Sequence, residues 1–328
     1  MFHVPKNKTT YWQPSASYEA LSLRAKTLRK IRDFFHAKKV MEVETPLLCH
    51  TSVTDPFIAS IPAHLKIDSH EKYYYLQTSP EYAMKRLLAA GYGDIYQITK
   101  AFRQEESGRY HNPEFTMLEW YRLDFNHHQL MDEMDELLQS ILKTSKAERK
   151  TYAELFKFYL KISPHQASIE ALEKCAKENN VVIQNKITDQ TTWLQLLFTH
   201  CIEPQIGNSV PCFIYDFPAS QAALSQIQYD KNPPVASRFE VYFKGIELAN
   251  GFHELQDENE QRKRFEKNLI QREQLGLPTL PIDEYFLAAL SHGLPNCAGV
   301  ALGMDRLMML LTESNHIANT LSFDFARA

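Results

Sequence analysis

The sequence has few cysteines, few glycines and no long apolar run. Its five cysteines are an odd number without a Cys-x-x-Cys pair, which argues against both a disulfide framework and a zinc site. No apolar stretch is long enough to span a bilayer, and the N-terminal residues lack the apolar segment of a signal peptide. These absences predict a cytoplasmic protein with no membrane partner.

Positive charge is not in excess either. The chain carries 36 lysine and arginine residues against 40 aspartate and glutamate residues, for a formal net charge of −4. Because neutralisation of phosphates supplies most nucleic-acid affinity, an acidic chain is a poor generic nucleic-acid binder. We therefore expect no stable nucleic-acid partner, although a local basic patch is compatible with this composition.

The glycines are unevenly spread, and none lies between Gly108 and Gly207. Within that interval, apolar residues at 130, 134, 137, 138 and 141 have helical spacing, which predicts a mainly helical insertion at about 125–205. Helices inserted between strands without a regular strand–helix alternation favour an α+β fold with a mostly antiparallel sheet. We expect a polar arm over 1–16 and one domain over 17–328.

Local signals predict the elements near the N-terminus. Apolar residues at helical spacing predict a helix over 18–38, for which Ser17 is a suitable N-cap. Alternation over 40–45 predicts a strand. A second helix is expected at Ser79-Pro80, with the serine as cap and the proline at the first helical position, and Gly91 closes it.

The most informative segment is 102–121, FRQEESGRYHNPEFTMLEWY. Strand alternation places Arg103 and Glu105 on one face, and Phe115 and Tyr121 on one face of the returning strand. A guanidinium suits bidentate contact with phosphate, and an aromatic ring stacks on a purine. An exposed charged hairpin would explain any one of these residues, but the whole set favours a nucleotide site.

Two later segments add phosphate and cation chemistry. The run 299–306, GVALGMDR, predicts a strand that enters a helix N-terminus, where free N–H groups suit a phosphate. A structural turn with an Asp–Arg pair would give the same pattern. The run 238–255 contains Glu240 and Glu247, hard oxygen ligands suited to Mg²⁺, although a single glutamate usually just faces solvent. Its Asn250-Gly251 pair is typical of a turn or bulge.

These segments resemble the class II aminoacyl-tRNA synthetases, in the form found in lysyl-tRNA synthetases. The run 31–46 resembles motif 1, 102–121 resembles motif 2, and 299–306 resembles motif 3. The resemblance covers about 17–328. It implies a class II catalytic core that activates a lysine-like amino acid with ATP and Mg²⁺, and a homodimer formed through motif 1. Catalysis by positioning and charge neutralisation needs no protein nucleophile.

The same resemblance implies roles for individual residues. Two arginines would be catalytic, Arg103 and Arg306. ATP would be bound by Arg103, Gln104, Glu105, Asn112, Phe115, Glu247, Leu248, Gly303 and Arg306. The amino acid would be bound by Ser79, Pro80, Glu81, Tyr121, Glu254 and Ala301, and Mg²⁺ by Glu240 and Glu247. An acidic pocket formed by Glu81 and Glu254 would select a substrate with an additional ammonium group.

Two positions depart from the lysyl-tRNA synthetase pattern. Tyr110 stands where those enzymes usually have arginine, with Arg109 one place earlier, and Ala301 replaces the middle glycine of motif 3. The added methyl should change the selection of the amino acid rather than abolish ATP binding. The motif 1 helix is also expected to start near residue 18, which leaves no room for a preceding β-barrel anticodon-binding domain.

A short acidic core with these features resembles the elongation factor P–(R)-β-lysine ligases. That family transfers β-lysine to a lysine of a tRNA-shaped translation factor. The resemblance implies elongation factor P as the protein acceptor and β-lysine or lysine as the small-molecule substrate. Two alternatives stay open, a truncated synthetase that charges tRNA and a non-catalytic paralogue that binds an amino acid and regulates a partner.

Overall fold

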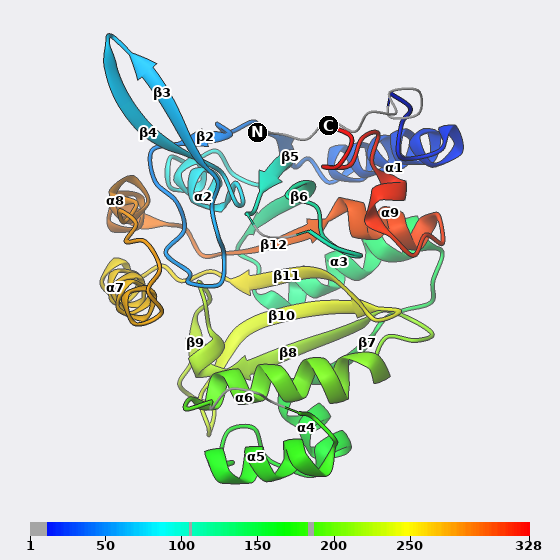
Figure 1. Cartoon of the computed structure of the whole chain (residues 1–328), viewed down its shortest axis with the longest axis vertical. Helices are drawn as coiled ribbons and strands as arrows, with labels where there is room; N and C mark the ends of the chain where they lie inside the picture. The colour runs from blue at the N-terminus through cyan, green and yellow to red at the C-terminus, as the bar shows by residue number, and fades with distance from the viewer. Residues whose placement is uncertain (1–11, 105–106, 183–186) are drawn as a thin grey trace, which may run out of the picture.

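The computed structural model describes residues 12–104, 107–182 and 187–328. Its centre is a nine-stranded sheet in the order β1-β5-β6-β12-β11-β10-β8-β7, with β9 paired to β10 (Figure 1). The strands are β1 Met41–Glu42, β5 Ile95–Phe102, β6 Glu114–Leu123, β7 Glu148–Thr151, β8 Cys212–Pro218, β9 Ile227–Gln228, β10 Val235–Phe243, β11 Ile246–His253 and β12 Cys297–Gly303. β1 pairs with β5, and β7 with β8, in parallel, and the other neighbours in this sheet are antiparallel. The expected α+β class with a mostly antiparallel sheet is confirmed.

A second, three-stranded sheet projects from the body of the molecule (Figure 1). It contains β2 Leu48–Cys49, β3 Pro62–Ile67 and β4 His70–Leu76. Asp68 and Ser69 join β3 to β4, and both have positive φ, as a tight two-residue hairpin requires.

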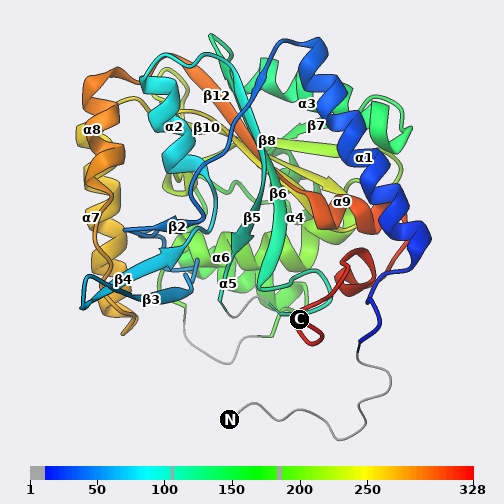
Figure 2. The same ribbon diagram turned by 90° about the horizontal axis from the view of Figure 1, so that it is seen from above.

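Nine α-helices are formed by the described residues. They are α1 Tyr18–Ala37, α2 Glu81–Ala89, α3 His127–Leu142, α4 Tyr152–Leu160, α5 Ile169–Glu178, α6 Gln190–Leu197, α7 Glu258–Gln274, α8 Glu284–Gly293 and α9 Met304–Leu311. α2, α7 and α8 gather at one end of the sheet (Figure 2). Among the residues that the structure describes, no helix is long and apolar enough to cross a bilayer.

The helix starts test the local signals. The Ser17 side chain accepts a hydrogen bond from the Ala20 N–H at 3.2 Å, which confirms the cap of α1. The expected cap of α2 is wrong, because the helix begins at Glu81 and Pro80 itself occupies the N-cap without a side-chain capping bond. Ser79 therefore lies one residue too early to reach the first free N–H groups. Gly91, with φ of +84°, ends this helix as expected.

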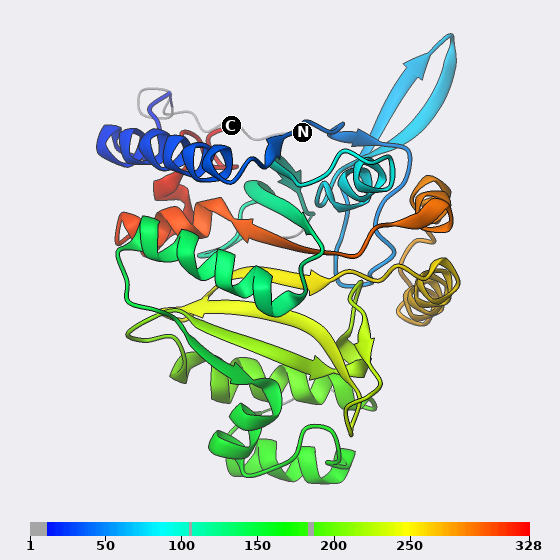
Figure 3. The same cartoon turned by 180° about the vertical axis from the view of Figure 1, so that it is seen from behind.

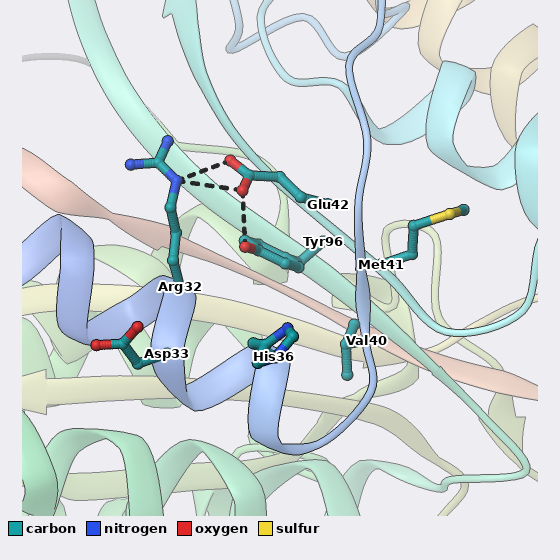
Figure 4. A pocket seen from close by; sticks show the side chains of 7 residues that line it. All are labelled: Arg32, Asp33, His36, Val40, Met41, Glu42 and Tyr96. Atoms are coloured by element: carbon teal, nitrogen blue, oxygen red, sulfur yellow. Dashed lines mark hydrogen bonds and ion pairs between the residues drawn. The ribbon is translucent and has the colours of Figure 1, made fainter.

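The connection after α1 forms less strand than the alternation predicts. Only Met41 and Glu42 pair with β5, at the edge of the large sheet. There, the Arg32 Nε of α1 donates to both carboxylate oxygens of Glu42 at 3.1 Å (Figure 4). The Tyr96 hydroxyl of β5 donates to the same carboxylate at 2.8 Å. A short edge strand is thus tied to the helix before it.

The two faces of the large sheet have different partners. Leu118 and Trp120 of β6 pack against α1 and α3, which cover one face (Figure 3). Trp120 Nε1 also donates to Glu133 of α3 at 3.1 Å. Because side chains alternate along a strand, Glu119 and Tyr121 point to the opposite face. That opposite face carries the candidate site.

The pair Asn250-Gly251 does not form a turn. Both residues lie inside β11, and the chain turns instead at Lys244-Gly245, where both residues have positive φ. The Phe239 ring of β10 occupies the space where a Cβ of Gly251 would lie. The glycine is therefore explained by cross-strand packing.

The helices α4, α5 and α6 pack together in a second core. Their apolar residues contact β8 and β10 on the face that also carries Glu119. Helices α3 to α6 occupy most of the interval expected to be helical, and the strand β7 interrupts them.

Candidate active site

Strand register aligns a row of side chains across the sheet. Ala301 of β12 lies opposite Glu119 of β6 on one side and Asn250 of β11 on the other. Asn250 in turn lies opposite Glu240 of β10. Directly opposed residues have Cβ atoms about 4.5–5.5 Å apart, so these four side chains are neighbours on one face. Ala301 is partly exposed whereas Leu302 is buried, which places the methyl of Ala301 on the floor of an open site.

An acidic pocket lies at one end of this row. Glu81 is at the start of α2, and Glu254 directly follows β11. The Lys85 Nζ lies between them, 2.6 Å from Glu81 Oε1 and 2.6 Å from Glu254 Oε2. The Tyr121 hydroxyl donates to Glu119 Oε1 at 2.7 Å. The structure thus brings together Glu81, Glu254 and Tyr121, as the sequence predicts, and adds two charged residues.

The buried carboxyls in this pocket are hard to ionise. Burial and the charge of Glu81 together raise the pKa of Glu119 to about 8. Burial raises the pKa of Glu254 to about 8 against the charge of Lys85. Glu119 Oε2 is buried and has no hydrogen-bond partner among the described residues. An ammonium group placed here would provide that partner and favour ionisation.

Gly299 gives these side chains their space. It lies opposite Tyr121 across β12 and β6, and a Cβ at this position would collide with the Tyr121 ring. The same Cβ would lie 2.6 Å from Glu254 Oε1. Since neither group could stay in place, the glycine is required by the pocket and not by backbone conformation.

Arg306 lies at the other end of the site, in the first turn of α9. Its Nη1 donates to the Glu247 carbonyl at 2.8 Å and lies 3.3 Å from Glu247 Oε2. Its Nη2 lies 2.7 Å from His111 Nε2. The neighbouring Asp305 does not pair with Arg306, because it is buried and binds Arg24 Nη1 at 2.6 Å and the Thr116 N–H at 2.7 Å. The guanidinium of Arg306 is thus held at the surface of the site by β11 and the motif 2 loop.

The motif 2 residues differ in their contacts and exposure. The Arg103 guanidinium lies over the Phe115 ring, 5.1 Å from its centroid, so the two side chains make a cation–π contact. The Asn112 side chain is buried and bonds backbone, donating to Glu114 O at 2.6 Å and accepting from the Phe325 N–H at 3.0 Å. Gln104 is exposed, and Glu105 lies outside the described residues.

The remaining predicted residues line the same face or support it. Leu248 is buried in the core beneath β11, and its carbonyl lies close to Gly303 at the start of α9. Gly303 is the N-cap of α9, and the first two residues of the helix, Met304 and Asp305, are buried. Ser79 and Pro80 lead into α2 beside Glu81.

Carboxylates gather near Glu240. Its oxygens accept from Arg238 Nη2 and from the Tyr242 hydroxyl. Burial raises the pKa of Glu240, and the nearby charge of Glu247 raises it further. Glu203, which follows α6 and the short π-helix Phe198–Ile202, has its pKa raised to about 7 by burial and by the charges of Glu247 and Glu240. Mutual repulsion of this kind is relieved by a hard cation, although the described residues form no complete ligand cluster of three or more.

Three charged residues of the site escape sequence reasoning. Lys85 follows Glu81 by four residues and so shares its helix face, a spacing that could have indicated the pair. Glu119 shares a strand face with Tyr121, so strand alternation could have indicated that it belongs to the same site. Glu203 comes from the helical insertion, and nothing in the sequence links it to the distant strands β10 and β11.

Comparison with known proteins places this geometry in a family. A family model described as tRNA synthetases class II (D, K and N) matches residues 5–326. A protein of Vibrio cholerae named elongation factor P–(R)-β-lysine ligase is 52% identical over 320 residues, covering 97% of this chain and 98% of the relative. Relatives with the same name from Pseudoalteromonas translucida and Vibrio vulnificus are also 52% identical, over 320 and 317 residues, with 98% of each relative covered. The chain belongs to the elongation factor P–(R)-β-lysine ligase family of class II synthetases.

Membership in this ligase family has a direct chemical consequence. Class II synthetase-type domains are ATP-dependent ligases, and so is this chain. The motif 2 strands β5 and β6 and the motif 3 strand β12 lie side by side in the sheet. Of the residues expected to bind nucleotide, metal and amino acid, Tyr121, Ala301 and Glu240 lie on one face of this sheet.

Proposed function

We propose that the protein activates (R)-β-lysine with ATP and transfers it to a lysine side chain of elongation factor P. The observation that carries this proposal is the placement of an acidic pocket, with Glu81, Glu119 and Glu254, on the same sheet face as Arg306. The names of the relatives support the choice of substrate and acceptor.

The reaction has two steps. A carboxylate oxygen of the amino acid attacks the α-phosphorus of ATP, the new O–P bond forms, and pyrophosphate leaves with the electron pair of the broken P–O bond. The neutral amine of the acceptor lysine then attacks the carbonyl carbon of the adenylate. An amide forms, AMP leaves with the electron pair of the broken C–O bond, and the amine loses a proton.

The chain's own residues position the reactants and neutralise charge. Arg103 and Arg306 carry permanent positive charges at the rim of the site and would contact ATP phosphates. The Phe115 ring beside Arg103 would support the adenine. The amine-binding groups would be Glu81, Glu119 and Glu254, with Ser79, Pro80 and Tyr121 completing the wall and Ala301 the floor. In a partly enclosed site such preorganised charges lower the barrier without reorganisation.

Mg²⁺ would be held by Glu240 and Glu247. Both are carboxylates whose repulsion raises the pKa of Glu240, and Mg²⁺ commonly uses one or two carboxylates together with phosphate oxygens and water. When bound, the ion would neutralise charge on the phosphates of ATP.

Two assays test the proposal. The first is exchange of labelled pyrophosphate into ATP with (R)-β-lysine, (S)-β-lysine and α-lysine, which measures adenylate formation alone. The second is mass spectrometry of elongation factor P after reaction with ATP and Mg²⁺, with tRNA-Lys as a competing acceptor. We expect the strongest exchange with (R)-β-lysine and one added residue on one lysine of the factor. An unmodified factor together with efficient charging of tRNA-Lys would contradict the proposal and support a synthetase.

A further inference from the structure

Lys85 has an unusual position for a lysine. Its side chain is only 1% exposed, and its ammonium contacts Glu81 and Glu254 at 2.6 Å each. The Phe286 ring of α8 lies 5.6 Å from the same ammonium and closes the space behind it. The titratable groups that face it are Glu81 on α2, Glu119 and Tyr121 on β6, Glu254 after β11 and Cys297 on β12.

We propose that Lys85 is a positioning residue that sets the charge and the shape of the amino-acid pocket. Its ammonium fixes the carboxylates of Glu81 and Glu254, and it leaves the pocket with the charge that a substrate with two ammonium groups requires. This inference rests on the proposed function, because it assumes that a lysine isomer is the substrate.

The charge count follows from the residues present. The pocket contains three carboxyls, Glu81, Glu119 and Glu254, and the single ammonium of Lys85. When all are ionised, one carboxylate is balanced internally and two negative charges remain. A diammonium substrate such as β-lysine matches these two charges, whereas an amino acid with one ammonium group would leave one carboxylate unbalanced in a buried site.

Stability of the fold does not by itself explain why position 85 is a lysine. Burying an ammonium has a large desolvation penalty, and apolar replacements of buried ion pairs are often neutral or stabilising. The position adjoins an apolar cluster that includes Met84, Leu88 and Phe286, where a methionine side chain would pack well. A charge at this position is therefore better explained by the needs of the pocket.

The protonation states agree with this role. Burial alone would lower the pKa of Lys85, but the charges of Glu254 and Glu81 raise it above its ordinary value, so the group stays charged. In return, Lys85 is the cation that opposes the raised pKa of both Glu119 and Glu254. Without it, both carboxyls would ionise only at higher pH.

The activity test compares Lys85→Met with Lys85→Arg in the pyrophosphate exchange assay. We expect Lys85→Met to raise the KM for β-lysine about tenfold or more, with the KM for ATP within a factor of about two. The rise of kcat/KM for β-lysine with pH should move to higher pH, and Lys85→Arg should restore part of both effects. The control is Arg86→Met, the next residue on α2, which is exposed and lies 5.2 Å from the Tyr285 ring. A wild-type KM and pH profile in Lys85→Met would overturn the inference.

A second measurement needs no substrate. Without the cation, folding must keep Glu119 and Glu254 protonated, so the variant loses stability as pH rises from the ordinary glutamate pKa toward the raised folded value. We expect the melting temperature of Lys85→Met to fall further below wild type at about pH 9 than at about pH 6. If Lys85→Met does not fold, Lys85→Gln replaces it in both tests. A difference that is constant with pH would overturn the inference, whereas a wild-type enzyme that activates no lysine isomer would defeat only the proposed function.

Discussion

At the scale of single residues, the site depends on ionisable groups held away from water. Glu119 and Glu254 are almost fully buried, at 2% and 1% exposure, and each has a pKa raised to about 8. Such carboxyls are costly to ionise away from water, and in the proposed function an ammonium group of the substrate would offset that cost. Recognition of the amino acid would then be coupled to proton release.

This coupling predicts a pH-dependent KM for the amino acid. Ionised carboxylates bind ammonium groups and protonated ones do not, so the KM for β-lysine should fall as pH rises toward about 8 and then level off. The KM for ATP should follow a different curve, because the titratable groups at that end of the site are Glu203 and Glu240, and the pKa of Glu203 is raised only to about 7. Pyrophosphate exchange at a series of pH values measures both, and equal changes in the two constants would exclude this explanation.

The arginines of the site give a sharper mutational prediction. Arg306→Ala and Arg103→Ala should each lower kcat/KM for adenylation by about 2–4 kcal/mol of transition-state stabilisation, since each would remove a proposed charge-assisted phosphate contact. Circular dichroism should show an intact fold. A matched control is Arg149→Ala. Arg149 lies on β7, away from the site, and its Nη2 is 2.7 Å from Asp132 Oδ1. Near-normal exchange in either folded variant would refute the assignment.

Ala301 makes a prediction about selectivity. Its methyl lies on the floor between Glu119 and Asn250, where the lysyl-tRNA synthetase pattern has glycine. Ala301→Gly should raise the ratio of kcat/KM for α-lysine to that for β-lysine, because the floor becomes deeper. The variant should also lose about 0.5–1 kcal/mol of stability, as glycine does in a strand interior. An unchanged ratio in pyrophosphate exchange would remove Ala301 from the specificity residues.

At the scale of elements, local signals predict some boundaries well and miss others for physical reasons. The cap at Ser17 and the entry of β12 into α9 depend on neighbouring residues alone, and both are present. The role of Gly251 depends on the Phe239 ring of another strand, which no local pattern reveals. Likewise, Lys85 could be paired with Glu81 from helix spacing, but its contact with Glu254 requires the tertiary fold. The face of β6 that carries the site was predictable from alternation, and the contribution of Glu203 was not.

One buried ion pair helps to hold α9 against α1 and β6. Asp305 is 2% exposed at its side chain and binds Arg24 of α1 at 2.6 Å and the Thr116 N–H of β6 at 2.7 Å. Asp305→Ala leaves a largely buried guanidinium and a buried N–H without this partner, so we expect a loss of about 3–5 kcal/mol in the free energy of unfolding. Urea denaturation measures this loss. The double variant Arg24→Ala with Asp305→Ala should lose less than the sum of the two single losses, and strict additivity would show that the pair is not coupled.

At the scale of the whole molecule, one sheet face is divided between packing and chemistry. The core under α4, α5 and α6 covers β8 and β10, and α2, α7 and α8 pack at the other end through the cluster around Phe286 and Tyr121. The row from Glu119 to Glu240 runs between them. The residues of the site thus come from segments far apart in the chain, and strand register fixes their spacing.

The edge of the sheet formed by β1 predicts self-association of the chain. β1 is the terminal strand, has only two residues, and leaves Met41 43% exposed beside α1. Arg32, Asp33 and His36 of α1 line a hollow next to it (Figure 4). An uncovered strand edge with an exposed apolar side chain is a surface that proteins usually cover, and this segment resembles the motif through which class II synthetases dimerise. We therefore expect a homodimer through α1 and β1.

Light scattering during size exclusion tests the dimer. The wild-type protein should have twice the 38.1 kDa mass of the chain, and Met41→Glu should shift it toward the monomer, because a buried unpaired charge at an interface is costly. Ile270→Glu is the matched control, since Ile270 lies on α7 at the other side of the molecule and is 57% exposed. That variant should remain a dimer. A monomeric wild type, or equal dissociation in both variants, would show that this edge is not the contact surface.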